Sequence, residues 1–129
     1  MPLFPLRRSQ NERISTFLSE VRASVKVVTI NLLRIMELKS RFGSEDELKL
    51  RLDATVSELR NLKAILEKQN LKLKELDDEA YEAIRLMEAY SIISEREGTA
   101  FIDENAERVL RAARWCDGSI SRAIKNMKR

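Results

Sequence analysis

The side chains that most often carry catalytic or metal chemistry are nearly absent from this chain. The sequence has 129 residues, with 24 Lys and Arg and 21 Asp and Glu, but no His and a single Cys. Zinc sites and pairs of a nucleophile and its general base depend heavily on those two residue types. An enzyme would have to work with carboxylates, Lys and Arg alone. We therefore predict a protein that is not an enzyme and that uses no cofactor, no metal and no small-molecule substrate.

Cys116 cannot form an internal disulfide, because it is the only cysteine. It follows Trp115, and only nearby arginines are available to lower the pKa of its thiol. We favour a core or interface contact for this pair over a reactive thiol.

Basic side chains offer another kind of chemistry, namely contact with an anionic surface. Arg7 and Arg8 follow a mostly apolar start at residues 1 to 6, a pattern similar to a small membrane-surface anchor. A disordered terminus and ordinary solvated helix faces fit the same residues. Nucleic acid is a less favoured partner, because aromatic residues make up only 5% of the chain and give no stacking platform. The candidates for anionic-surface contact are Arg7, Arg8, Arg22, Lys26, Arg122 and Lys125.

The charges form three blocks along the chain. Residues 1–42 carry 8 basic and 3 acidic side chains, residues 43–97 carry 9 and 14, and residues 98–129 carry 7 and 4. We favour pairing of helices within one chain or plain solvation of these charges over pairing of staggered copies of the chain.

The element that must position these side chains is a long helix. Four leucines recur at seven-residue spacing and continue in register through Ala80 and Met87, and no proline follows Pro5. This heptad predicts an all-α fold, either a long antiparallel helical hairpin or a coiled-coil bundle of three to five helices. We favour the inner face of a hairpin over a dimerisation zipper. The predicted packing or oligomer stripe contains Leu52, Leu59, Leu66 and Leu73, together with Val28, Leu32 and Ile35 of an earlier helix.

The earlier helix is predicted over residues 9–42, closed by Gly43 as its C-cap. Between residues 25 and 38 apolar side chains spill beyond one stripe, among them Val27, Ile30 and Leu33. We therefore expect this part to be buried on more than one side, either at the centre of a bundle or in an oligomer interface.

Further helices are predicted over residues 44–76, 77–97, 99–116 and 119–127, with residues 1–8 flexible and residues 9–129 forming one helical domain. Ser44 and Glu47 have the spacing of a capping box.

Asp77 and Asp78 fit either a turn with an Asp cap or an exposed spot on one continuous helix. An unbroken helix over residues 44–97 would be about 80 Å long, so a compact monomer requires a break there.

Three segments resemble the helical core of ESCRT-III proteins, especially the archaeal cell-division type. They are residues 48–53 (LKLRLD), 73–81 (LKELDDEAY) and 104–107 (ENAE), within a resemblance that spans residues 48–125. The chain departs from the family at Asn105, where an apolar residue is usual, and it lacks a recognisable tail motif for the disassembly ATPase. The resemblance implies a helical hairpin that polymerises on a membrane without catalytic residues or cofactors.

Two hypotheses for function follow. The first is a self-assembling, ESCRT-III-like filament subunit that remodels membranes or acts in cell division, with a second copy and an anionic membrane as partners. The alternative is a soluble coiled-coil adaptor or helical-bundle interaction module that binds itself or another helical protein and no membrane.

The longest uncharged run of the first helical pattern, residues 27–33, is far shorter than the about 20 residues of a spanning helix. The short, proline-rich start does not fit a secretory signal peptide, so we expect a cytoplasmic protein, with peripheral membrane contact as an option.

Overall fold

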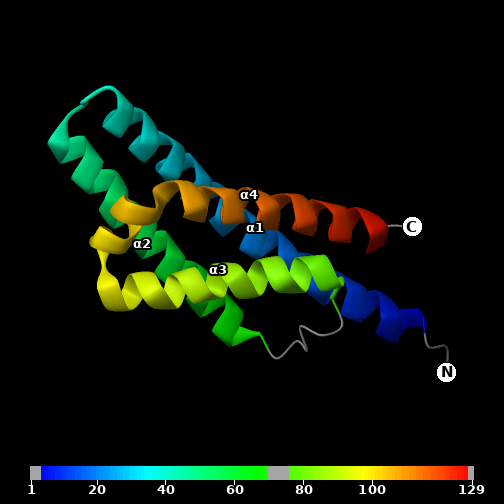
Figure 1. The fold of residues 1–129 in the computed structure, drawn as a ribbon. Coiled ribbons are helices and arrows are strands. Elements are labelled where there is room, and N and C mark those ends of the chain that lie inside the picture. The colour runs from blue at the N-terminus through cyan, green and yellow to red at the C-terminus, as the bar shows by residue number, and fades with distance from the viewer. Residues whose placement is uncertain (1–3, 70–75, 128–129) are drawn as a thin grey trace.

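The computed structural model describes residues 4–69 and 76–127, and these form four α-helices. The helices are α1 (Phe4–Ser40), α2 (Glu45–Lys68), α3 (Asp78–Glu97) and α4 (Thr99–Met127). Successive helices run in opposite directions, and α1 packs against α2 and α4 while α3 packs against the same two helices from the other side (Figure 1). The all-α prediction is confirmed, and its form in the described residues is a four-helix bundle.

The first helix is longer than the sequence predicted and ends differently. It begins at Phe4 rather than at residue 9, because Pro5 lies in the first turn, where a missing N–H breaks no helical hydrogen bond. At the other end the left-handed residue is Phe42, with φ 52°, and not the predicted Gly43. The N–H of Gly43 donates to the carbonyl of Leu38 at 2.8 Å, and a Cβ on Gly43 would lie 2.6 Å from Leu38 Cδ2. A side chain at residue 43 would therefore require the side chain of Leu38 to move, and the dihedral angles of Gly43 do not themselves demand glycine.

The second helix begins as predicted, but only half of the capping box forms as expected. The side chain of Ser44 accepts a hydrogen bond from the N–H of Glu47 at 3.3 Å. The carboxylate of Glu47 is engaged elsewhere, because Arg34 of α1 donates to both of its oxygens at 2.7 and 3.1 Å. The sequence spacing gave the helix start correctly, but an interhelical ion pair takes the second capping group.

Polar contacts fix the antiparallel register of α1 against α2. Asn31 accepts from Arg51 at 3.1 Å, and Ser24 donates to the carboxylate of Glu58 at 2.7 Å. Together with the pair between Arg34 and Glu47, these contacts step along α1 in one direction and along α2 in the other. Slipping the two helices by one turn would break all three.

The doublet Asp77 and Asp78 marks a helix start and not the middle of one helix. The second helix ends at Lys68, earlier than the predicted residue 76, and Asp77 caps α3 by accepting from the N–H of Glu79 at 2.9 Å. The chain therefore folds back between α2 and α3, as a compact monomer requires (Figure 1). Leu73, predicted as part of the leucine stripe, lies outside the described residues.

The last two helices meet at Gly98, whose φ of 74° is one that favours glycine. The predicted break between residues 116 and 119 is wrong, since α4 continues through Asp117 and Gly118 to Met127. A glycine inside a helix costs only about 1 kcal/mol, and the buried side chains of Cys116 and Ile120 on either side hold this part of α4 against the core. The irregular residue is Asn105, whose side chain donates to the carbonyl of Phe101 at 2.9 Å.

The predicted packing stripes lie inside the bundle. A single core cluster joins all four helices, and its members from the predicted set are Leu52, Leu59, Leu66, Val28, Leu32 and Ile35. The leucine heptad is thus satisfied within one chain, in the described residues, as an inner face and not as a zipper.

Replacing Leu59 by Ala should lower the free energy of unfolding by about 2–5 kcal/mol, because the side chain is fully buried and its removal leaves a cavity. Urea denaturation followed by circular dichroism measures the change. The matched control is Leu50→Ala on the same helix, where the side chain is 65% exposed and the loss should be below about 0.5 kcal/mol. Equal losses in the two variants would contradict the assignment of the inner face.

Replacing Phe42 by Gly should raise the free energy of unfolding by about 0.5–1 kcal/mol, because glycine adopts a positive φ without a steric penalty. The ring of Phe42 is 96% exposed, so little packing is lost. Phe42→Ala is the control, since alanine removes the ring but keeps the Cβ that causes the strain. Urea denaturation followed by circular dichroism measures both variants. An equal change in the free energy of unfolding for the two would disprove backbone strain at Phe42.

Candidate interaction surface

The one thiol of the chain is poorly suited to chemistry. Cys116 lies on α4 with no exposed surface. Burial, and then the nearby charge of Asp117, raises the pKa of this thiol to about 12. The thiol is therefore protonated near neutral pH, and a protonated thiol is a poor nucleophile.

The described part of the chain, residues 4–69 and 76–127, contains no group of three or more Cys, Asp or Glu side chains arranged to hold a metal ion. Several of its carboxylates instead form ion pairs between helices. Lys63 lies 2.7 Å from Glu95, and Lys39 lies 2.9 Å from Asp103. The hydrogen bond between Lys63 and Glu95 raises the pKa of the lysine and lowers that of the glutamate.

A polar cluster joins the start of α3 to the C-terminal half of α4. Glu79 accepts a hydrogen bond from the indole N–H of Trp115 at 2.9 Å and from the guanidinium of Arg122 at 2.7 Å. The pKa of Glu79 is lowered, first by the hydrogen bond from Trp115 and further by Ser119 and Arg122. Trp115 is thus a contact between helices, packed against the core with its polar atom bound at the surface. The sequence gives no sign of its partner, because Glu79 lies 36 positions away.

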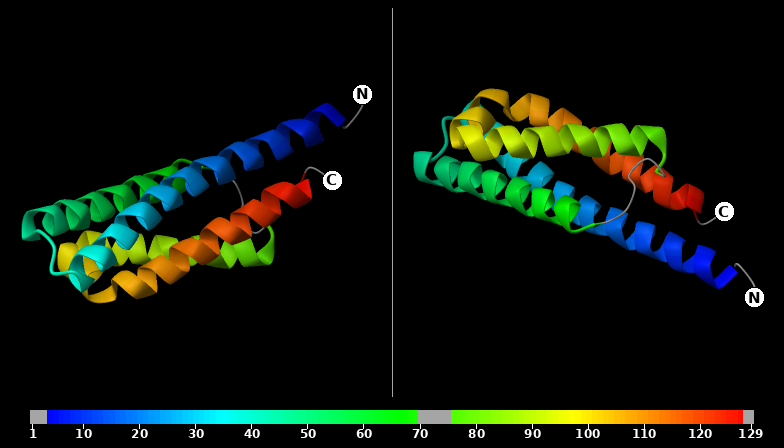
Figure 2. Two further views of the ribbon diagram at one scale, coloured as in Figure 1. Left: turned by 90° about the horizontal axis from the view of Figure 1, so that it is seen from above. Right: turned by 90° about the horizontal axis from the view of Figure 1, so that it is seen from below.

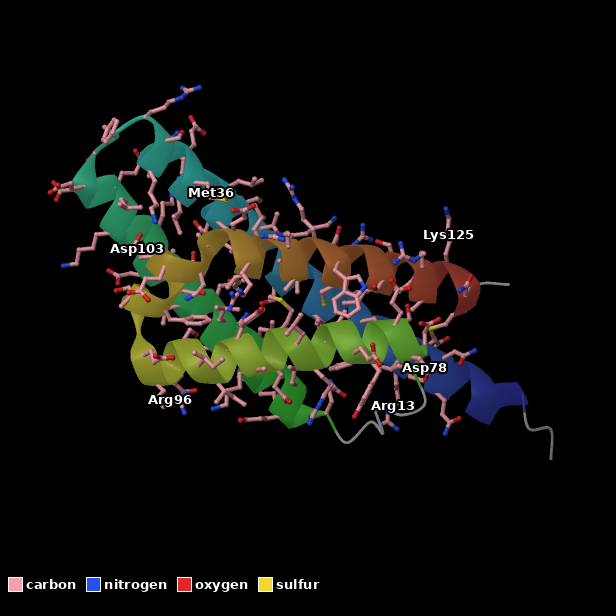
Figure 3. The ribbon with its side chains drawn as sticks, in the orientation of Figure 1. Arg13, Met36, Asp78, Arg96, Asp103 and Lys125 are labelled. Carbon is pink, nitrogen blue, oxygen red and sulfur yellow. The ribbon has the colours of Figure 1, made fainter. Side chains whose placement is uncertain are left out.

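The predicted anionic-surface residues do not share one environment. Arg22 pairs with Asp117 at 2.8 Å, and Arg122 is held by Glu79. Lys26 and Lys125 are exposed, and Figure 3 shows the side chain of Lys125 pointing away from the helices. The side chains of Arg7 and Arg8 lie outside the described part of the structure. Two of the four described residues are therefore engaged within the chain.

An apolar surface lies on α1, where the sequence predicted burial on more than one side. That prediction is wrong for the single chain. Val27, Ile30 and Leu33 are 41, 61 and 42% exposed, although the inner side of the same segment is fully buried. Of the described helices, α2 and α4 flank α1 and leave this outer side uncovered (Figure 2, left). Clustered exposed apolar side chains are typical of surfaces that bind another protein.

No family model, no curated protein and no solved structure matched this chain. The ESCRT-III resemblance therefore rests on its three sequence segments and stays a prediction. Among the described residues, no helix is both long enough and apolar enough to cross a membrane.

Glu47 should make the stability of the fold depend on acid pH. Its pKa is lowered, mainly by the hydrogen bond from Arg34. A carboxyl group with a depressed folded-state pKa stabilises the fold above its unfolded pKa of about 4.3, and this contribution is lost as the pH falls through the folded-state pKa. Glu47→Gln should therefore melt below the wild type at neutral pH, with the gap closing as the pH falls below about 4.3 and through the folded-state pKa.

Melting temperature measured against pH tests this expectation. The matched control is Glu45→Gln, an exposed carboxylate in the same first turn of α2, which keeps the contact between Arg34 and Glu47. A gap between Glu47→Gln and the wild type that does not narrow as the pH falls below about 4.3 would contradict a lowered pKa for Glu47 in the folded state.

Proposed function

We propose that this protein is a non-enzymatic helical bundle that self-assembles and serves as a protein-interaction module. The observation that carries the proposal is the exposed apolar surface at the middle of α1, formed by Val27, Ile30 and Leu33. This segment lies on a helix whose other side is firmly packed, so it offers a rigid surface to a partner. A preorganised helix face binds with little loss of conformational entropy.

The leucine heptad is not available for assembly of the closed bundle, because its side chains form part of the core. Leu52, Leu59 and Leu66 are buried in the core, so a partner cannot reach them unless the bundle opens. Assembly of the closed bundle must use outer faces. This supports docking of intact bundles over a zipper built from the leucine heptad.

The competing proposal is the membrane-remodelling filament implied by the ESCRT-III resemblance. The observation in its favour is that Lys26 and Lys125 are exposed and available to anionic head groups. Against it, Arg22 and Arg122 already bind carboxylates of the same chain. We therefore place the interaction module first.

Light scattering coupled to size-exclusion chromatography tests self-assembly directly. The wild type should show a mass above the 15.0 kDa of one chain, and Ile30→Asp should return it to one chain while circular dichroism stays unchanged. The matched control is Ile92→Asp, an exposed isoleucine on α3 that should leave the assembly intact. Because apolar contact drives the association, high salt should not abolish it.

A mass of one chain at every concentration for the wild type would overturn the proposal. Sedimentation with vesicles of anionic lipid then separates the two candidates. Binding that falls with rising salt, together with filaments in electron micrographs, would favour the membrane filament instead.

A further inference from the structure

The outer side of α1 carries a second heptad pattern that the bundle leaves exposed. Positions alternate in steps of four and three, as in a coiled-coil seam, and every side chain of this set is exposed. We call this set the outer stripe. It consists of Ser19, Ala23, Lys26, Ile30, Leu33, Glu37 and Ser40.

The inner side of the same helix has the same pattern with different chemistry. Its steps of four and three run through Leu18, Val21, Val25, Val28 and Leu32, all fully buried. One helix thus presents two seams, of which the bundle covers one. Heptad spacing keeps a seam facing the same neighbour over several turns, so the outer stripe has the geometry to follow a partner helix.

The outer stripe is self-complementary when a second copy runs antiparallel to it. About a point between Asn31 and Leu32, Ile30 faces Leu33, Lys26 faces Glu37, and Ala23 faces Ser40. Each pair has matching character, since the central pair is apolar, the next is oppositely charged and the outer one is small. A two-fold axis repeats every pair, as an isologous dimer requires.

A parallel pairing of the same stripe is unfavourable. It would bring Lys26 against Lys26 of the partner subunit and Glu37 against Glu37 of the partner subunit, and like charges at a seam repel. Charge pattern therefore selects the antiparallel direction, while Ile30 and Leu33 supply the apolar contact.

We propose that a second copy of this chain docks antiparallel on the outer stripe, with Ile30 packed against Leu33 of the partner subunit and Lys26 paired with Glu37 of the partner subunit. This inference rests on the proposed self-assembly and specifies its surface and direction. Every side chain of the outer stripe is exposed, and Figure 2 (left) shows α2 and α4 on either side of α1 with α3 farther away.

The carboxylate of Glu37 has room for the additional partner. Within one chain it accepts from Arg34 at 3.0 Å and lies 3.6 Å from Arg41, and both contacts are made by Oε1. The other oxygen stays available to a lysine, because a carboxylate has about four acceptor positions. The side chain of Glu37 is 43% exposed, so a partner can reach it.

Charge reversal followed by mixing tests both the surface and the direction. Lys26→Glu places two acidic side chains at each end of the seam, and Glu37→Lys places two basic ones there. Each variant alone should associate about tenfold more weakly than the wild type, as sedimentation velocity measures. An equimolar mixture of the two should recover the wild-type affinity, because each lysine then meets a glutamate of the other chain.

Glu20→Lys is the matched control, an exposed acidic residue on α1 outside the outer stripe, and it should associate as the wild type does. Circular dichroism of each variant confirms that it folds. If the wild type associates and mixing restores nothing, this inference is wrong while the proposed self-assembly stands. If the wild type is a monomer throughout, both are wrong.

Discussion

Burial of one apolar side of every helix in a shared core is the constraint on which this structure depends. The inner residues of α1, such as Val28 and Leu32, are covered by α2 and α4 only because the chain reverses direction at each connection. The caps at Ser44 and Asp77 and the positive φ of Gly98 make those reversals compatible with satisfied helix ends. The core and the connections therefore depend on each other, because opening a connection would expose the apolar sides of the helices that it joins.

The same constraint leaves α1 with a free side. A helix at the corner of a four-helix bundle is covered by two neighbours, and its remaining surface is normally polar. In this chain that surface includes Ile30 and Leu33, between charged residues of opposite sign. The proposed docking of a second copy would cover the isoleucine at the most exposed of these positions.

Much of the fold follows from the sequence, because local rules and the tertiary structure agree. The heptads predicted the helices and their buried residues, while the capping box at Ser44 and the predicted helix end at residue 97 located two of the connections. The break at Asp77 stayed open, since a change from leucine to alanine suits both a turn and a continuing helix. The predicted break between residues 116 and 119 is wrong, because packing of the neighbours of Gly118 outweighs its low helix propensity. The exposure of Ile30 could not be predicted, since hydrophobicity indicates burial without saying whether the cover comes from the same chain.

A single distance between two copies distinguishes antiparallel from parallel pairing. A nitroxide attached at Ser19→Cys on every chain allows the separation between labels to be measured by pulsed electron paramagnetic resonance, with the buried Cys116 shielded from the reagent. An antiparallel dimer centred between Asn31 and Leu32 places the two labels about 40 Å apart, from a rise of 1.5 Å per residue. A separation near 10 Å, the spacing of parallel neighbouring helices, or the absence of any dipolar coupling between chains, would contradict the account.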